Sequence, residues 1–501
     1  MKNLLTAKTL TKLSWSLIFF SIASAALLRF GMLFNYTAFQ GDQAVHGQYI
    51  MNLWEGKPPT LGPSSSVGGH SLTPLHYYLF WAFTIFGSHP VFQALPNAVF
   101  SFFSVPALIY FIYRLLNKSS RHFRLFISAV SGFWWTFFYN DVLFASFEWN
   151  PNSIAYFGLS FILLIDLILH RYIGGTKTHT LAWILLGINT ALFTSLHTTT
   201  LLLYPIIFTL FVFYNIYKDK SAKLPVLSVL SFVLTLTPYW IGELQTRGGN
   251  TKALIRTLLG STSTLTALEK INRIFFNYFE IGSMYLEGTL PHIATFFLGL
   301  VLVIAIYQFV GNTKMWTWYL MSMLLYFLIS MNYTGIYFAH YKEVFWSFPI
   351  ILTAVTLNYF FTLKPSPARF TSFALISIII GLSVFVNTRQ IYRTFQQKYG
   401  VEREVGVSDY IDIFSSLPTS STVCTPYIPS AYDRSALTFI DKYNSKRSIN
   451  ILGDCKTGYY QILPKYSFKD IGQKQINTKN PLPVGTQVVQ NGQSYYLLLV
   501  K

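Results

Sequence analysis

Apolar stretches about as long as a membrane is thick recur along this chain. Examples are residues 13–34, 91–116 and 370–387. Each approaches the roughly 20 apolar residues that an α-helix needs to cross about 30 Å of hydrocarbon. Because lipid offers no hydrogen-bond partner to open backbone groups, such spans must be helical. Only 11% of the residues are charged and 52% are hydrophobic, so we predict an all-α polytopic membrane bundle.

The basic residues lie mainly in short connections between these apolar runs. Although the formal net charge is +18, they form no continuous stripe, so we expect no nucleic-acid partner. By the positive-inside rule, the basic connections face the cytoplasm, and two spans separate each from the next. This pattern predicts about eleven spans, with a cytoplasmic N-terminus and an extracytoplasmic C-terminus. The predicted spans are residues 13–34, 91–116, 123–140, 153–170, 180–196, 199–217, 224–242, 292–311, 314–331, 344–362 and 369–388.

The apolar run at residues 72–86 is too short for a full crossing. It has about 15 residues, whereas a span requires roughly 20. Counting it as a span would also turn the basic residues of segment 114–124 to the outside. We therefore predict a short interfacial or re-entrant helix within a first outer loop at residues 35–90. This loop belongs to a transmembrane domain that covers residues 1–388.

The composition changes after residue 388, where charged and small polar residues return. No later stretch is long enough to span a bilayer, so we predict a small extracytoplasmic α/β domain at residues 389–501. The alternating runs 486–490 and 494–500 flank Asn491-Gly492-Gln493 and predict a β-hairpin. Helical patterns occur near residues 408–414 and 431–443.

Cys424 and Cys455 are the only cysteines, and both fall in this predicted outer domain. An oxidising compartment permits a disulfide between them but does not require one. Elsewhere the sequence has no local metal-ligand spacing, no phosphate-binding glycine loop and no nucleophile elbow. We accordingly assign no metal ligands from sequence.

The two sides of the predicted bundle differ in their polar residues. Inner connections carry mainly basic residues, whereas the outer ends of several spans carry acids, amides and histidines. This placement favours chemistry at the outer rim over passage through the membrane, because transport sites generally lie near the midplane. The outer polar residues are Asp42, His46, Glu55, His70, His76, Asn140, Asp141, Glu148, Asn150, Asn152, His197, Glu243, Arg247, Lys252, His340, Lys342 and Glu343.

Short motifs follow one another along the predicted transmembrane domain. They are Gly41-Asp42-Gln43, Pro58-Pro59-Thr60-Leu61-Gly62-Pro63, Thr73-Pro74-Leu75-His76-Tyr77-Tyr78, Trp149-Asn150-Pro151-Asn152, Pro238-Tyr239-Trp240-Ile241-Gly242-Glu243-Leu244 and His340-Tyr341-Lys342. In this order and placement they resemble the GT-C class of integral-membrane glycosyltransferases, which includes protein O-mannosyltransferases and lipid A aminoarabinose transferases. The resemblance covers residues 1 to about 390. Gln43 departs from the usual Asp-Glu pair, and Ser71-Leu72-Thr73 replaces a basic residue common in that class.

The resemblance implies a transferase of the cell envelope. Such an enzyme takes a sugar from a polyprenyl-phosphate carrier and transfers it, with inversion, to a glycan, lipid or protein acceptor at the outer face of the plasma membrane. No cofactor follows from the resemblance, and a divalent metal stays open because relatives differ in metal use. Membrane lipid is the other expected partner.

Asp42 is the residue we expect to act as the general base. Transfer to a hydroxyl requires a group that removes the proton as the oxygen attacks, and a carboxylate performs this role. Asp42 opens a helical segment in the first outer loop. The alternative reading is structural, because aspartate is also favoured as a helix N-cap. Both roles are compatible in one side chain.

The departing lipid phosphate requires positive charge or hydrogen-bond donors. Lys342 sits at the outer end of an apolar span beside His340, where a lipid head group would lie. Arg247 follows Glu243 in an outer loop and is a third candidate phosphate ligand. Snorkelling of Lys342 to the interface and simple solvation of Arg247 are the structural alternatives.

A second group of residues is expected to assist. Two acids about seven positions apart can share one helix face, and they are suited to orient the acceptor or to bind the sugar. Amide and histidine side chains near the same rim can hydrogen-bond a sugar. The supporting candidates are Asp141, Glu148, Asn150, His197 and Glu243.

Two other classes of protein share some of these features. A transporter or flippase for lipid-linked sugars is also a polytopic bundle with buried polar groups, although we find neither repeated halves nor broken midplane helices in the sequence. A non-catalytic subunit of a glycan assembly complex would tolerate removal of the rim acids.

Overall fold

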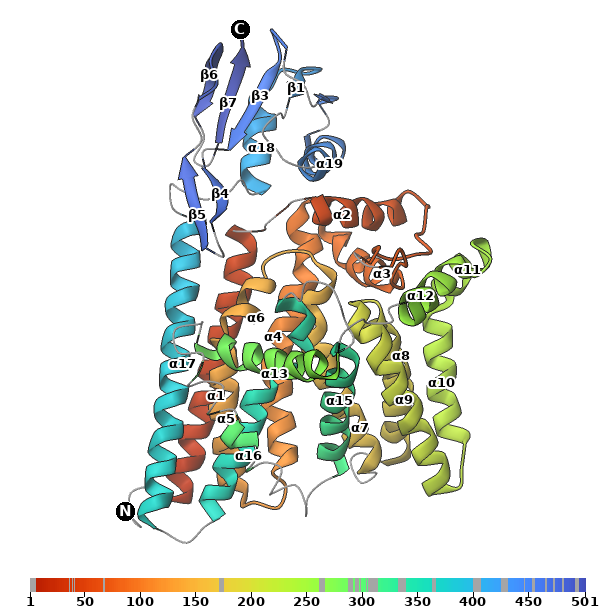
Figure 1. The fold of residues 1–501 in the computed structure, drawn as a ribbon, viewed down its shortest axis with the longest axis vertical. Helices are drawn as coiled ribbons and strands as arrows, with labels where there is room; N and C mark the ends of the chain where they lie inside the picture. The colour runs from red at the N-terminus through yellow and green to blue at the C-terminus, as the bar shows by residue number, and fades with distance from the viewer. Residues whose placement is uncertain are drawn as a thin grey trace.

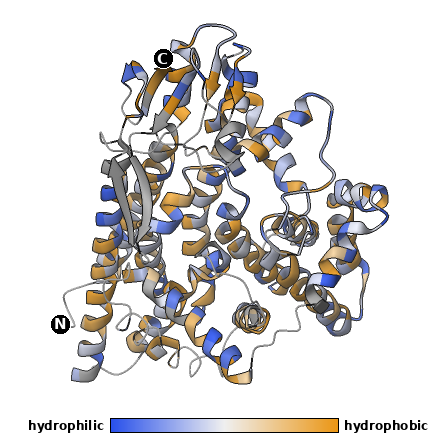
Figure 2. Ribbon diagram, turned by 45° about the horizontal axis from the view of Figure 1, so that its top comes forward, coloured by the Kyte–Doolittle hydropathy of each residue, from blue (hydrophilic) through white to orange (hydrophobic). Residues whose placement is uncertain are grey.

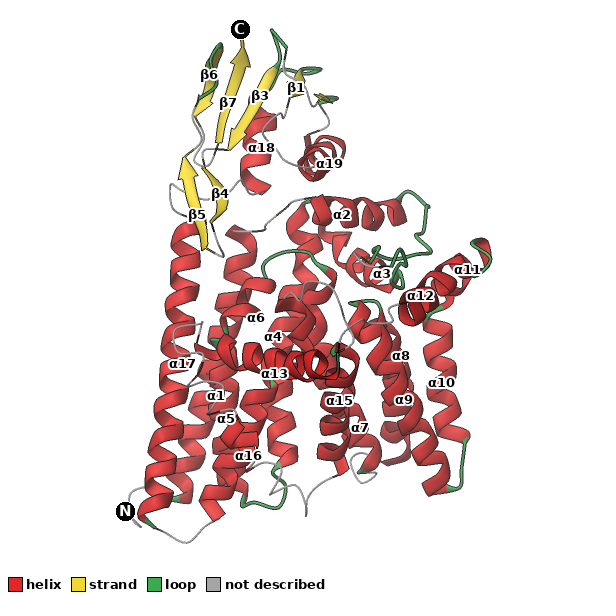
Figure 3. Cartoon of the chain, viewed as in Figure 1, coloured by secondary structure: helices red, strands yellow, loops and turns green. Residues whose placement is uncertain are grey.

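The computed structural model of the protein consists mainly of helices, with its strands confined to the C-terminal part (Figure 3). The structure describes residues 6–35, 37, 39, 41–65, 68–170, 175–260, 266–286, 292, 297, 299–302, 304, 314–331, 339–362, 366–399, 407–424, 431–445, 447–452, 456–464, 466–471, 474–479, 482–491 and 495–501.

The long helices run side by side and form an apolar bundle (Figure 1). They share one large hydrophobic core, in which α1 packs against α4 and α5, and α8 packs against α7 and α10. Hydrophobic residues dominate these helices along their length (Figure 2). The bundle helices are α1 (Ala7–Asn35), α4 (Pro90–Leu115), α5 (Arg121–Thr136), α7 (Ile154–Leu169), α8 (Gly175–Thr194), α9 (Thr198–Asp219), α10 (Lys223–Thr235), α15 (Lys314–Ser330), α16 (Phe348–Thr362) and α17 (Pro367–Tyr399).

Six helices in the described part of the chain have the length and hydropathy of a membrane span, or seven if α10 and the helix after it count as one. The protein is therefore an integral membrane protein. The other predicted spans at 123–140, 180–196 and 314–331 coincide with α5, α8 and α15, which do not meet the same criterion. The predicted span at 292–311 lies mostly outside the described residues. The predicted number of eleven therefore stays a prediction.

The predicted span at 224–242 is broken in the structure. Helix α10 ends at Thr235, and α11 (Thr237–Gln245) leaves at an angle of 55° to it. Pro238 lies in the first turn of α11, where its missing N–H costs no helical hydrogen bond. A proline placed there favours a new helix over continuation of the old one.

Shorter helices join the long ones, and α2 and α3 lie across the end of the bundle that faces the C-terminal domain (Figure 1). The run predicted to be interfacial or re-entrant forms α3 followed directly by a 3-10 turn, η1, and is too short to span. The short elements are α2 (Gly41–Trp54), α3 (Leu75–Trp81), η1 (Ala82–Phe86), α6 (Tyr139–Phe144), η2 (Asn150–Ser153), α12 (Gly249–Gly260), α13 (Ala267–Ser283), η3 (Met284–Leu286) and η4 (Ala339–Phe345).

The C-terminal domain combines helices with a five-stranded mixed sheet of order β2-β1-β3-β7-β6 and a separate β4-β5 ribbon. The predicted hairpin is confirmed, because β6 and β7 pair antiparallel across residues 491–495. Helix α17 continues past residue 389 to Tyr399 before this domain begins. Cys424 is disulfide-bonded, and Cys455 lies outside the described residues. The elements are α18 (Val407–Ser416), β1 (Thr422–Cys424), α19 (Ala431–Ile440), the π-turn η5 (Asp441–Ser445), β2 (Asn450–Leu452), β3 (Tyr460–Pro464), β4 (Tyr466–Ile471), β5 (Lys474–Lys479), β6 (Thr486–Asn491) and β7 (Tyr495–Val500).

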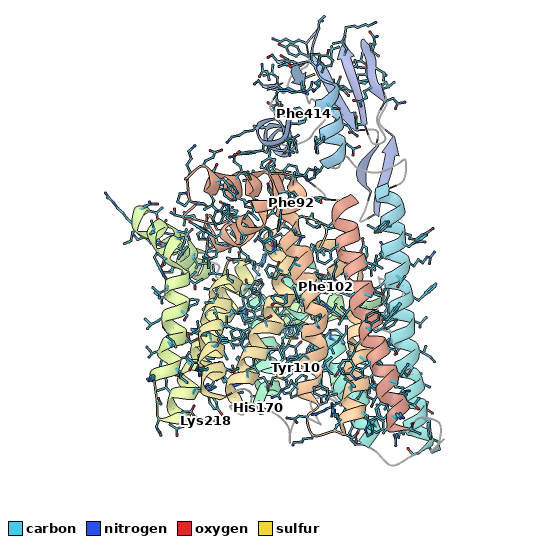
Figure 4. All side chains as sticks on the ribbon, turned by 180° about the vertical axis from the view of Figure 1, so that it is seen from behind. Phe92, Phe102, Tyr110, His170, Lys218 and Phe414 are labelled. Carbon is cyan, nitrogen blue, oxygen red and sulfur yellow. The ribbon has the colours of Figure 1, made fainter. Side chains whose placement is uncertain are left out.

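The start of the chain and the C-terminal domain lie at opposite ends of the bundle (Figure 1). Figure 4 shows His170 and Lys218 near the end that is remote from Phe414 of the C-terminal domain. The predicted orientation requires this arrangement, since it places basic residues inside and the domain outside.

The C-terminal domain docks on α2. The rings of Phe39 and Phe439 lie 5.2 Å apart within a shared apolar cluster. Beside them, Glu55 accepts hydrogen bonds from Nζ of Lys442 at 2.7 Å and from the hydroxyl of Tyr443 at 2.9 Å. The amide of Gln48 donates to the same hydroxyl at 2.6 Å. These contacts join the first outer loop to the turn that follows α19.

We expect this contact to weaken at low pH. Hydrogen bonds from Lys442, Tyr443 and Lys57 lower the pKa of Glu55 from 4.5 to about 2. The stabilisation is therefore complete above pH 4.5 and is lost as the pH falls toward 2. Glu55→Gln at neutral pH should reproduce the loss, seen as faster hydrogen exchange in α2 and in residues 441–445.

The matched control is Lys57→Met, which removes only the lysine that is 72% exposed. That variant should exchange like the wild type, because an exposed ion pair contributes little. Equal protection in wild type and Glu55→Gln would show that the apolar contact alone holds the domain.

Candidate active site at the rim of the bundle

Asp42 lies in the first turn of α2, with its side chain exposed. His46 follows one helical turn later and therefore lies on the same side of the helix. Its side chain is buried, with 7% of the residue exposed. Burial lowers the pKa of His46, but the carboxylates of Glu148 and Asp42 outweigh this effect and raise it above its usual value. Asp42 is thus close enough to His46 to act on its charge.

Glu148 lies between two histidines. Its Oε1 atom is 3.2 Å from Nδ1 of His46 and 2.9 Å from Nε2 of His76. Glu148 is 1% exposed and His76 is fully buried. Burial lowers the pKa of His76 to about 4. Burial raises the pKa of Glu148, but the two histidines outweigh this effect and lower it. The carboxylate thus favours the charged form of His46, whereas burial keeps His76 neutral.

The backbone on both sides of Glu148 is held in place by amide side chains. Nδ2 of Asn97, in α4, donates to the carbonyl oxygens of Phe147 at 2.9 Å and Trp149 at 3.0 Å. Nδ2 of Asn152 donates to the carbonyl of Phe147 at 3.1 Å. These bonds satisfy backbone groups that no helix pairs and direct the carboxylate of Glu148 toward α2 and α3.

His46 and His76 are the residues that sequence reasoning did not assign to the site. Both were among the polar residues of the outer face, but neither lies near Glu148 in the chain. One signal was present, since His46 follows Asp42 by four positions and shares its helix face. His76 gave no comparable signal, because its contact with Glu148 depends on how α3 packs.

Asp141 is separate from this cluster. Its Oδ2 atom lies 2.5 Å from a guanidinium nitrogen of Arg29 and accepts a hydrogen bond from the hydroxyl of Ser101 at 2.6 Å. Arg29 is fully buried in α1 and also donates to the carbonyl of Thr136. The arrangement ties α1, α4 and α6 together. We infer a structural role for Asp141.

Lys342 lies in η4, where it is 1% exposed and forms an ion pair with Glu280 of α13. The ring of Tyr341, its neighbour, lies 4.6 Å from the ring of His197. The side chain of His340 lies outside the described part of the chain. Lys342, the predicted phosphate ligand, is thus already paired with the carboxylate of Glu280.

The remaining candidates lie on other elements. His197 is the N-cap of α9 and accepts from the backbone N–H of Thr199. Asn150 is buried and donates to the carbonyl of Leu196, so both side chains shape the backbone where α8 meets α9. Glu243 is buried in α11, and Arg247 follows it as an exposed residue with a positive φ of 54°.

Comparison with solved structures shows that the bundle, with the short helices across its end, has the GT-C fold. ArnT from Cupriavidus metallidurans bound to undecaprenyl phosphate has a TM-score of 0.55 and 9% identity, over 96% of this chain and 97% of that chain. ArnT in the apo state has a TM-score of 0.54 and 8% identity over the same shares.

A more distant likeness is to the oligosaccharyltransferase AglB from Archaeoglobus fulgidus, in complex with an inhibitory peptide and a dolichol-phosphate. The TM-score is 0.47 at 12% identity, and the match covers 87% of this chain and 64% of that chain. No protein family and no curated protein matches the sequence.

Proposed function

We propose that this protein is a membrane glycosyltransferase that moves a sugar from a polyprenyl-phosphate donor to an acceptor at the outer face, with inversion. The observation that carries the proposal is the exposed carboxylate of Asp42 beside the buried cluster of His46, Glu148 and His76. The proposal is also supported by the fold, which this protein shares with ArnT, a protein crystallised with undecaprenyl phosphate.

In this proposal Asp42 takes the proton of the acceptor hydroxyl while that oxygen attacks the anomeric carbon. The bond from the anomeric carbon to the phosphate oxygen breaks, and the polyprenyl phosphate leaves with the electron pair. The buried cluster acts as a positioning device, because it joins α2 to α3 and to residues 147–149. A base held in this way needs little reorganisation during the reaction.

Lys342 is the proposed donor-phosphate ligand, with His340 and Arg247 as further candidates. The carboxylate of Glu280 is the anion that now accompanies Lys342. A phosphate that binds there replaces this carboxylate, since a buried ammonium requires one anionic partner. Arg247 is exposed and free of the bundle core, so it can approach a phosphate at the surface. We propose Glu243 for acceptor or sugar binding, and Asn150 and His197 for positioning.

The test is a transfer assay with purified protein in liposomes. Radiolabelled sugars on polyprenyl phosphate are supplied with pools of glycan, lipid or peptide acceptors, and the released polyprenyl phosphate is measured. Release that depends on an acceptor supports the proposal. Movement of the intact donor between leaflets without release would instead identify a flippase. If no donor gives either release or movement, the result would favour a non-catalytic subunit.

A further inference from the structure

We propose that His46, His76 and Glu148 form a binding site for one divalent transition-metal ion, of the Zn2+ type. One ligand atom from each residue lies within 4.8 Å of the other two, and all three residues are buried. Two imidazoles and one carboxylate form a ligand set typical of zinc sites that keep an open fourth position.

The spacing of the atoms matches the size of such an ion. Zinc bonds of about 2.0–2.1 Å place neighbouring tetrahedral ligands about 3.3 Å apart. In this protein the carboxylate oxygen of Glu148 is 3.2 Å from the nitrogen of His46 and 2.9 Å from that of His76. The two histidine nitrogens lie within 4.8 Å of each other, so coordination requires them to approach by at most about 1.5 Å.

The three ligands are also supported independently. His46 lies on α2 and His76 lies on α3. Glu148 lies between two residues whose backbone carbonyls accept hydrogen bonds from the amide of Asn97. The elements therefore hold the ligands before an ion arrives, which reduces the ordering cost of binding. Burial excludes competing water from two of the three ligands, which are at most 1% exposed.

If the proposed function holds, the ion also serves that reaction. Asp42 and the proposed ligand His46 lie one turn apart on α2, so a bound ion would lie on the same side of this helix as the proposed base. A cation at that point stabilises an anionic phosphate or a hydroxyl that is losing its proton. The metal site itself does not rest on the proposed function, and its test does not use transfer activity.

The experiment uses full-length protein purified without a histidine tag and without chelator. Elemental analysis should find about one equivalent of zinc or a related metal per chain. After removal of that metal, added Co2+ should produce the visible spectrum of a tetrahedral site with nitrogen and oxygen ligands. His46→Ala, His76→Ala and Glu148→Gln should each weaken Co2+ binding by more than about 100-fold, beyond the 10- to 100-fold typical of residues that only orient a ligand.

His70→Ala is the matched control, because His70 is another buried histidine of the first outer loop that lies outside the cluster. It should bind Co2+ like the wild type. Glu148→Gln keeps the shape of the side chain, so its thermal unfolding shows whether lost binding reflects lost folding. The proposal would be overturned if wild-type protein contained no metal and gave no tetrahedral spectrum with added Co2+. The three residues would then form a purely hydrogen-bonded cluster. Retained Co2+ binding in all three folded variants would overturn it as well.

Discussion

Asp42→Asn is expected to lower the rate of sugar transfer by about a hundredfold to ten-thousandfold, the usual contribution of a general base. Asparagine has nearly the same shape but cannot accept the proton of the acceptor hydroxyl. The expected cost to the helix is small, because an acid in an exposed first turn contributes only about 0.3–1 kcal/mol through the helix dipole. The measurement is release of polyprenyl phosphate in single-turnover assays with saturating donor.

The control for this prediction is Asp412→Asn in α18, which makes the same chemical change at an exposed acid of the C-terminal domain. That variant should keep full activity. Unfolding temperatures of both variants should stay close to that of the wild type, so that a loss of activity cannot be a loss of structure. A decrease of only a few-fold in Asp42→Asn would remove Asp42 from the role of base.

Arg29→Met is expected to destabilise the protein by about 3–5 kcal/mol, the typical cost of leaving one member of a buried ion pair without its partner. Arg29 is fully buried and holds Asp141, Ser101 and the carbonyl of Thr136. Methionine fills a similar volume, so the loss comes mainly from the stranded carboxylate of Asp141. Denaturant unfolding of the purified protein in detergent measures the change.

The double variant Arg29→Met with Asp141→Asn separates the charge from the packing. It removes the stranded carboxylate while an amide still meets Ser101, so it should be more stable than Arg29→Met alone. A destabilisation below about 1 kcal/mol in the single variant would mean that water or another cation reaches Asp141. Equal instability of the single and double variants would show that packing of Arg29, and not the ion pair, stabilises this part of the bundle.

Several parts of the fold followed directly from the chain. Long apolar runs predicted helices, and each described helix of the bundle overlaps a predicted span. The turn residues at 491–493 predicted the hairpin of β6 and β7. The break between α10 and α11 was less evident, because the apolar pattern continues through Leu236 and only Pro238 marks the new helix.

The site was predicted less completely than the fold. Asp42 and Glu148 were both selected from the predicted outer face, and the structure places them around the same histidine, His46. Asp141 appeared equivalent to Glu148 in the sequence, yet it pairs with Arg29 from the first helix. An arginine within an apolar run gives no indication of which acid it will meet.

The sequence by itself determined that this protein is a membrane bundle, with a loop after the first span that carries an acid at the start of a helix. Apolar length and turn chemistry act over a few residues, so they can be read locally. Only the tertiary structure decided which rim residues meet. Glu148 lies 102 positions from His46 and 72 from His76, and their contact depends on the packing of three separate elements, which no local pattern encodes.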